Sequence, residues 1–291
     1  TLYVNIKLII HAGTHKTAST SFQTLCSQNR KVLIDNKILF PEYLDWHQHS
    51  FAAWMSQKKD LDNLSLFLKS IFDDTKKKSC HTTLISGEAF ENFLVDTHLA
   101  LEFEELAKSL GYSDIHWIFV YRKPIEYLES IYAERSSYGV VLDISIMANI
   151  ILEYGYVSPS SKFYNNKFVF DVRRFAKLFQ KNVNKNLTII KFEDFIEGFV
   201  GKTLLNHFVF QKNSLDVLSY EAKKIGVVRK RPSLEKVEFR YVANFLNMRP
   251  HKEFYESNKT LINALLPHRI NIYKSVIEDI RFKFDEQFQE K

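Results

Sequence analysis

The chain has 291 residues, of which 45% are hydrophobic and 25% are charged, as in ordinary globular proteins. Its formal net charge of +6 suits anionic ligands but is too small and too evenly spread to indicate nucleic-acid binding. The two cysteines, Cys26 and Cys80, lack metal-ligand spacing and are too few for a disulfide framework. We therefore predict a cytoplasmic protein that binds no nucleic acid.

The apolar segments are short or interrupted by polar residues. The first, residues 4–10, contains Asn5 and Lys7 and predicts a strand rather than a secretory signal. The longest later segment, residues 140–152, contains Asp143 and is shorter than the roughly 18–20 residues that cross a bilayer. We expect no membrane span.

Strands and helices are expected to alternate along the first 200 residues. Short apolar runs predict strands at residues 4–10, 81–88, 114–122 and 187–194, and helical patterns occupy residues 94–110 and 169–180. Gly111 ends the first of these helices, and Pro124 opens another after the third strand. The lysine-rich segment Asp73–Ser79 is predicted to be a solvated loop.

The region from Ser214 onward is predicted to be mostly helical. In it Leu234, Val237, Tyr241 and Phe245 form one apolar stripe. The alternation before it predicts a parallel sheet flanked by helices. We therefore predict an α/β fold in one domain over residues 1–291, with its core at about 5–200 and a helical C-terminal portion at about 214–291.

Polar residues gather where the predicted strands end, at residues 11–23, 86–88, 121–122 and 192–194. Ligands of parallel sheets bind beyond the carboxyl ends of the strands. We therefore expect the functional site at this edge of the sheet.

The segment His11–Gln23 joins the first strand to a helix. Backbone N–H groups at a helix start bind anions, and Lys16 adds a full positive charge. Hydroxyl donors follow at Thr17, Ser19, Thr20 and Ser21. The segment therefore predicts a site for a phosphate-sized anion, the alternative being a hydroxyl-rich helix cap with an exposed lysine.

The ATP-binding pattern G-x-x-x-x-G-K-[ST] does not fit this segment. With Lys16 as its lysine, the pattern requires glycine at positions 10 and 15, which hold Ile10 and His15. We therefore do not expect this segment to bind ATP phosphates through that glycine-rich pattern.

The stretch "GTHKTASTSFQ" resembles the 5′-phosphosulfate loop of sulfotransferases that use 3′-phosphoadenosine 5′-phosphosulfate (PAPS), and the bacterial carbohydrate-type members look closest. The family core K-[TS]-G-T-[TS] falls on Lys16–Thr20, with Ala18 in place of glycine and Ser19 in place of threonine. Because alanine carries a Cβ, the loop tolerates Ala18 most easily if its φ is negative. The resemblance implies a fold like that of P-loop-containing nucleotide hydrolases. It also implies cofactor contacts from Thr14, His15, Lys16, Thr17, Ala18, Ser19, Thr20 and Ser21.

A second stretch, "VYRKPIEYLESIY", resembles the family's 3′-phosphate motif. Arg122 ends the third strand and Ser130 follows eight residues later, so the resemblance implies that both bind this phosphate. The alternative is that Arg122 pairs with Glu126 or Glu129 while Ser130 faces solvent. Arg229 and Arg231 lie in a later basic stretch that would reach the same phosphate, unless it is a solvated turn.

Glu88 follows the second strand, where several carbohydrate sulfotransferases use a glutamate base. The resemblance makes Glu88 the candidate for deprotonating the acceptor, the alternative being a helix N-terminal glutamate. His47 and His49 are candidate acceptor contacts, because related bacterial enzymes carry histidine after the first helix; a structural or surface role is the alternative. The pair lacks a third ligand, so we expect no metal.

These residues together predict a metal-independent sulfotransferase. It would move a sulfuryl group from PAPS to a hydroxyl of an acceptor that is a glycan on family grounds, with Lys16 and Glu88 as catalytic residues and adenosine 3′,5′-bisphosphate as product. The alternatives are a P-loop-type ATP-dependent kinase and an inactive nucleotide-binding protein of the same fold. The sequence predicts neither the acceptor nor the oligomeric state.

Overall fold

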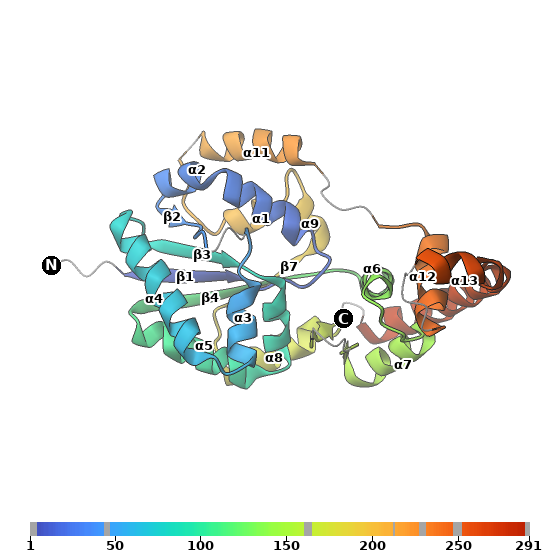
Figure 1. Ribbon diagram of the computed structural model, residues 1–291. Helices are drawn as coiled ribbons and strands as arrows, with labels where there is room; N and C mark the ends of the chain where they lie inside the picture. The colour runs from blue at the N-terminus through green and yellow to red at the C-terminus, as the bar shows by residue number, and fades with distance from the viewer. Residues whose placement is uncertain are drawn as a thin grey trace. The chain divides into compact units, whose positions relative to one another are not determined.

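The chain passes from one structural unit into a second, returns to the first and ends in the second (Figure 1). The computed structural model describes residues 5–43, 47–159, 165–211, 213–226, 231–246 and 252–288, with side chains of the last helix described from residue 258. Unit 1 comprises Thr1–Arg122 and Val172–Val228, and unit 2 comprises Lys123–Asp171 and Arg229–Lys291. The segment 123–171 thus groups with the C-terminal helices. The expected core at about 5–200 included this segment.

A five-stranded parallel sheet forms the centre of unit 1. Its strands are β1 (Ile6–His11), β2 (Ile38–Leu39), β3 (Thr82–Ser86), β4 (Tyr112–Tyr121) and β7 (Leu187–Lys191), in the order β2-β3-β1-β4-β7. All four pairings are parallel, which confirms the predicted α/β class. The short strand β2 was not predicted. Two residues are too few to give an alternating pattern.

Helices cover both faces of this sheet. They are α1 (Ser19–Gln28), α2 (Arg30–Asp35), α3 (Ser50–Gln57), α4 (Leu61–Lys77), the 3₁₀ helix η1 (Glu88–Leu94), α5 (Thr97–Ser109), α8 (Val172–Asn182), α9 (Phe192–Ile196), α10 (Lys202–Leu205) and α11 (Ser214–Ile225). In Figure 1 the helices α1, α2 and α11 lie on one face and α4, α5 and α8 on the other.

Alternate residues of the strands supply the two cores. Ile9 and Ile118 pack with Phe22 of α1 in one buried cluster. On the opposite face the Trp117 ring packs against Phe103 and Phe179, with ring centroids 5.8 and 5.4 Å apart. The sheet is therefore buried on both sides, as expected for a parallel sheet.

The lysine-rich segment is helical over most of its length, so its prediction as a loop was wrong. Helix α4 continues to Lys77 because it presents a buried face that extends to Thr75, which is fully buried. Lys76 and Lys77 lie in its last turn, where positive charge is favourable near the helix C-terminus. Only Lys78 and Ser79 lie beyond the helix.

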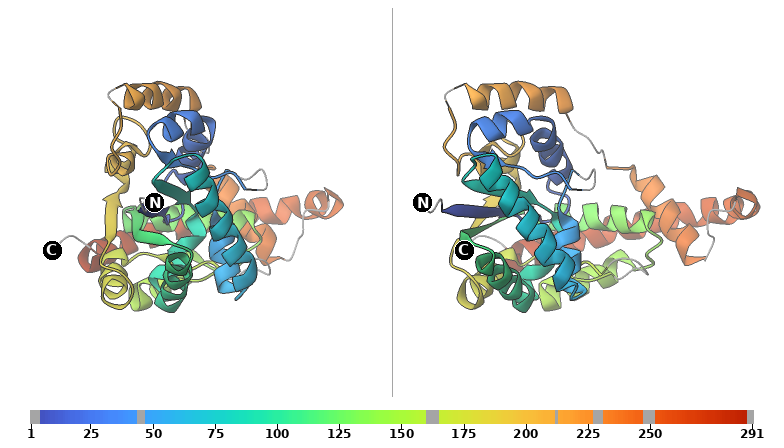
Figure 2. Two further views of the ribbon diagram at one scale, coloured as in Figure 1. Left: turned by 90° about the vertical axis from the view of Figure 1, so that its left-hand side faces the viewer. Right: turned by 60° about the vertical axis from the view of Figure 1, so that its left-hand side comes forward.

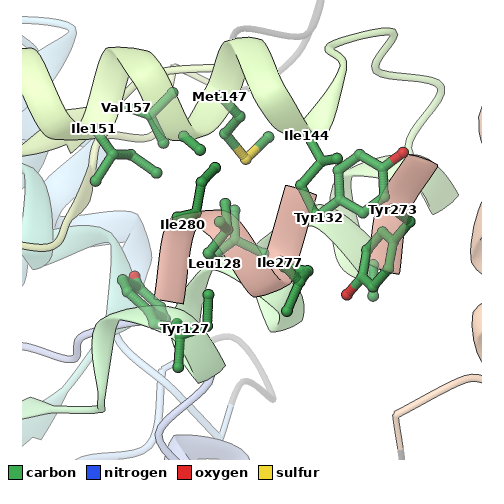
Figure 3. Packing of buried hydrophobic residues seen from close by; sticks show 14 of the residues in the cluster. Tyr127, Leu128, Tyr132, Ile144, Met147, Ile151, Val157, Tyr273, Ile277 and Ile280 are labelled. Atoms are coloured by element: carbon green, nitrogen blue, oxygen red, sulfur yellow. The ribbon is translucent and has the colours of Figure 1, made fainter. Parts of the chain in front are cut away.

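Unit 2 is mainly helical. It contains α6 (Pro124–Ser137), α7 (Ile144–Tyr154), the two-stranded antiparallel pair β5 (Tyr156–Val157) and β6 (Phe168–Val169), α12 (Leu234–Phe245) and α13 (Lys252–Phe288). Figure 3 shows Leu128, Met147 and Ile280 pointing toward one another between α6, α7 and α13. The predicted helical C-terminal portion is confirmed, and the turned views in Figure 2 show α13 as one long helix.

The predicted stripe of α12 is only partly buried. Val237 and Tyr241 are buried, whereas Phe245 is 66% exposed. Asp143, the charge that interrupts the long apolar segment, caps the N-terminus of α7 and pairs with Arg269 at 2.9 Å. Within the part of the chain that the structure describes, no helix combines the length and the apolar character that crossing a bilayer requires.

Candidate functional site

The loop of residues 12–18 leaves the carboxyl end of β1, the middle strand of the sheet. The chain places β3 on one side of β1 and β4 on the other, and such a change of direction marks the usual ligand site of a parallel sheet. His11 lies in register with Ser86 of β3 and with Ile118 of β4. The segments predicted to share this edge in unit 1 are therefore brought together.

The first part of the loop is fixed to β4. The Thr14 N–H and its hydroxyl both donate to the Val120 carbonyl at 2.9 Å, and the Val120 N–H donates to the Gly13 carbonyl. The Thr17 hydroxyl donates to the Thr14 carbonyl at 2.6 Å. Both threonines are buried, with exposed fractions of 1% and 0%. Their hydroxyls therefore hold the loop in shape, and neither lies on its surface.

Lys16, Ala18 and Thr20 are partly exposed and alternate with buried neighbours. Lys16 and Ala18 have left-handed backbone conformations, with φ of 60° and 59°. The condition of a negative φ at Ala18 is therefore not met, and the loop keeps the conformation that glycine favours. A Cβ in this region costs about 1–2 kcal/mol, so Ala18 is strained here.

Helix α1 begins directly after this loop. Its first-turn N–H groups have no acceptor within the helix, no described side chain caps them, and the first turn holds no acidic residue. The Ser19 hydroxyl is buried and has no hydrogen-bond partner among the described residues. Ser21 is 8% exposed. The amides of Ser19, Thr20 and Ser21 thus provide uncompensated positive charge, which suits an anion.

His15 is bonded to an acid that the sequence analysis missed. Oε2 of Glu91 accepts from the His15 N–H at 2.9 Å and lies 2.6 Å from its Nδ1. The Glu91 side chain is fully buried. The available signal was the spacing from Glu88 to Glu91, because residues three apart share a face of a 3₁₀ helix.

Glu88 is the first residue of η1 and is partly exposed. Its backbone lies against the loop: a Cβ placed on Gly13 would be 3.3 Å from both Cα and the carbonyl oxygen of Glu88. Gly87 has no room for a side chain, since a Cβ there would be 2.7 Å from the Ser50 nitrogen. The turn after β3 therefore brings the backbone of Glu88 beside the loop of residues 12–18.

Arg122 follows β4 and extends toward the same loop. Its Nη1 donates to the Lys16 carbonyl at 3.3 Å, and its guanidinium lies 4.8 Å from the ring centroid of Phe192. Stacking on an aromatic ring orients a guanidinium. The structure thus brings Arg122 together with Lys16.

The two predicted acceptor histidines differ in position. His47 is exposed, whereas His49 is fully buried. Nδ1 of His49 accepts from the Ser86 N–H at 3.0 Å, and its Nε2 lies 3.1 Å from the Pro41 carbonyl. Burial lowers the pKa of His49 to about 4, so the ring is neutral. One ring nitrogen of His49 therefore contacts the backbone at the end of β3, and the other contacts the backbone that follows β2.

Ser86 also bonds to a second buried histidine. Its hydroxyl lies 2.8 Å from Nδ1 of His11 and accepts from the Gln23 side chain at 3.0 Å. Burial lowers the pKa of His11 to about 3. This neutral network joins the ends of β1 and β3 beneath the loop, and it too was missed by the sequence analysis.

The remaining predicted residues belong to unit 2. The Ser130 hydroxyl donates to the Glu126 carbonyl at 2.8 Å, and the residue is 7% exposed. Arg231 donates to Glu129 at 3.0 Å and to the Tyr273 hydroxyl at 2.9 Å. Arg229 lies outside the described residues.

The described residues contain no group of three or more His, Cys, Asp or Glu side chains placed to hold a metal ion. Comparison of the chain with protein-family models, with curated proteins and with solved structures finds no match. The function must therefore be argued from the geometry of unit 1 and from the motifs.

Proposed function

We propose that the protein is a PAPS-dependent sulfotransferase that acts on a hydroxyl acceptor, with a P-loop-like sheet in unit 1. The observation that carries this proposal is the loop after β1. In this loop Lys16 is followed by the uncapped start of α1, and the loop leaves the strand that has β3 on one side and β4 on the other. The donor set fits an anion: first-turn amides, the buried unpartnered Ser19 hydroxyl, Lys16 and Arg122.

PAPS would supply an activated sulfuryl group joined to a 5′-phosphate. The amides of residues 19–21 bind the anionic end, and Lys16 stabilises the negative charge that grows on the leaving phosphate. Arg122 binds the 3′-phosphate, the group that the motif resemblance assigns to it.

Glu88 accepts the proton of the acceptor hydroxyl. The acceptor oxygen forms a bond to sulfur, the bond from sulfur to the phosphate oxygen breaks, and adenosine 3′,5′-bisphosphate leaves with the electron pair. Because the transferred group is an anion, positioning and charge stabilisation supply most of the rate. A glycan is the acceptor class that the family resemblance favours.

Two measurements test the proposal. The first is calorimetric titration with adenosine 3′,5′-bisphosphate and with ADP, each with and without Mg²⁺. We expect preference for the bisphosphate and no requirement for Mg²⁺, whereas tighter binding of ADP with Mg²⁺ would favour a kinase. The second is a screen of glycan acceptors with ³⁵S-labelled PAPS, in which bisphosphate binding without any transfer would favour an inactive nucleotide-binding protein.

A further inference from the structure

Glu91 is a fully buried acid whose carboxylate is hydrogen-bonded to His15, in the loop of residues 12–18. A single oxygen, Oε2, accepts from the His15 backbone N–H at 2.9 Å and contacts Nδ1 of the same residue at 2.6 Å. The His15 side chain is itself 9% exposed. A carboxylate is costly to bury unless it is hydrogen-bonded and paired. The two contacts with His15 offset this cost for Glu91.

The contact fixes both the backbone and the ring of His15. A backbone N–H can only donate, so Oε2 acts as an acceptor there, and the same oxygen lies within hydrogen-bond distance of Nδ1. The loop is thereby held at three successive points: Thr14 on Val120, His15 on Glu91 and the Lys16 carbonyl on Arg122.

Glu91 has two opposite physical effects on an anion in this loop. As a negative charge near the site it repels the anion and weakens binding. As an anchor it holds the loop in one conformation before the anion arrives, which strengthens binding because less ordering remains to be done. The sign of the change on removing the charge therefore identifies the dominant effect.

We propose that Glu91 is a positioning residue for anion binding, acting through His15 to hold residues 14–17 in the binding conformation. The proposal rests on the proposed function, since it takes the loop to be the 5′-phosphosulfate site. Glu91 does not touch the ligand in this assignment.

The test compares Glu91→Gln, His15→Asn and the double variant by titration calorimetry with adenosine 3′,5′-bisphosphate and with inorganic pyrophosphate. Glu91→Gln keeps the size of the side chain but weakens the anchor, because hydrogen bonds to a neutral amide are weaker than charge-assisted ones to a carboxylate. We expect about 10–100-fold weaker binding of both probes in each single variant, the range found for residues that orient a ligand-binding group. The double variant should bind each probe as tightly as the single variant with the larger loss of affinity, because both substitutions remove the same contact.

Glu104→Gln is the matched control. Glu104 is also buried in unit 1, but its carboxylate bonds to Trp117, Asn184 and Lys108 rather than to the loop. It should lower the free energy of unfolding with unchanged affinity for both probes.

Each other outcome counts against a defined claim. Unchanged or tighter binding in Glu91→Gln, or additive losses in the double variant, would overturn the role of Glu91. Pyrophosphate binding without preference for the bisphosphate over ADP would overturn the proposed function while leaving the Glu91 test in force. A wild-type chain that binds neither probe would overturn both.

Discussion

Nη1 of Arg122 donates a hydrogen bond to the Lys16 carbonyl at 3.3 Å, which joins the end of β4 to the loop that follows β1. The guanidinium is also stacked on Phe192 at 4.8 Å, at the start of α9. Three segments far apart in the sequence therefore meet at one cation. Arg122 contributes to the shape of the loop as well as to its charge.

Replacing Arg122 should weaken cofactor binding more than turnover. We expect Arg122→Ala to raise the KM for PAPS by about 10-fold or more, the loss of a charge-assisted hydrogen bond, with a smaller change in kcat at saturation. Arg122→Lys is the matched variant, because lysine keeps the charge but loses the planar donor edge. Steady-state kinetics measure both constants, and an unchanged KM for PAPS in Arg122→Ala would contradict the assignment.

Replacing Lys16 should affect the chemical step. We expect Lys16→Ala to lower kcat by about 10²–10⁴-fold, because the charge that stabilises the leaving phosphate is lost. Lys7→Ala is the control, since Lys7 lies at the other end of β1 with its side chain 58% exposed. Near-normal turnover in Lys16→Ala would remove the leaving-group role.

Replacing Glu88 should separate proton transfer from binding. We expect Glu88→Gln to lower kcat by about 10²–10⁴-fold with little change in bisphosphate affinity, since the amide cannot accept the acceptor proton. Glu91→Gln should show the reverse, a loss of affinity. If both variants change affinity and turnover to the same extent, the assignment of proton transfer to Glu88 and of loop positioning to Glu91 is wrong.

Periodicity in the sequence predicted the parts of the fold that depend on local pattern. The four longer strands, helix α5 and the helical C-terminal portion were found because each carries a continuous apolar run or stripe. The lysine-rich end of α4 was missed, since its polar composition conceals the buried Thr75. The grouping of residues 123–171 with the C-terminal helices was also missed, because it depends on contacts between distant segments.

The structure places the predicted strand ends of unit 1 at one edge of the sheet, but the partners of the candidate residues were not predicted. The family resemblance made Thr14 and Thr17 candidate ligands, yet the structure uses both hydroxyls on backbone carbonyls within the fold. Likewise His49 is buried against backbone, and Glu91 is bonded to the loop from a distance of 76 residues. A residue's partner decides its role here, and a single sequence does not give the partner.

Ala18 offers a test of strain in the loop. Because its φ is 59°, Ala18→Gly should relieve the left-handed backbone and raise the free energy of unfolding by up to about 1 kcal/mol, less the entropy that glycine adds to the unfolded chain. Ala18→Val should lower it, because a β-branched residue is poorly accommodated at positive φ. Urea unfolding curves measure both, and a lower stability of Ala18→Gly than of the wild type would contradict the strain.

Acid should destabilise the fold through the two buried histidines beneath the loop. Burial lowers the pKa of His11 to about 3 and that of His49 to about 4, from 6.5. Between pH 6.5 and about 4 the unfolded chain therefore binds protons that the folded chain does not. The contribution of each neutral ring is complete above pH 6.5 and falls with pH by up to about 1.4 kcal/mol per unit.

The variant His49→Asn isolates one of these two protons. Asparagine retains an oxygen that can accept from the Ser86 N–H but has no group that titrates in this range. We expect His49→Asn to be less stable than the wild type at pH 7.5 and to lose less stability between pH 6.5 and 4.5, as measured by urea unfolding at several pH values. The exposed His47→Asn is the matched control. If the pH dependence of His49→Asn equals that of the wild type, the His49 ring does not carry the acid sensitivity assigned to it.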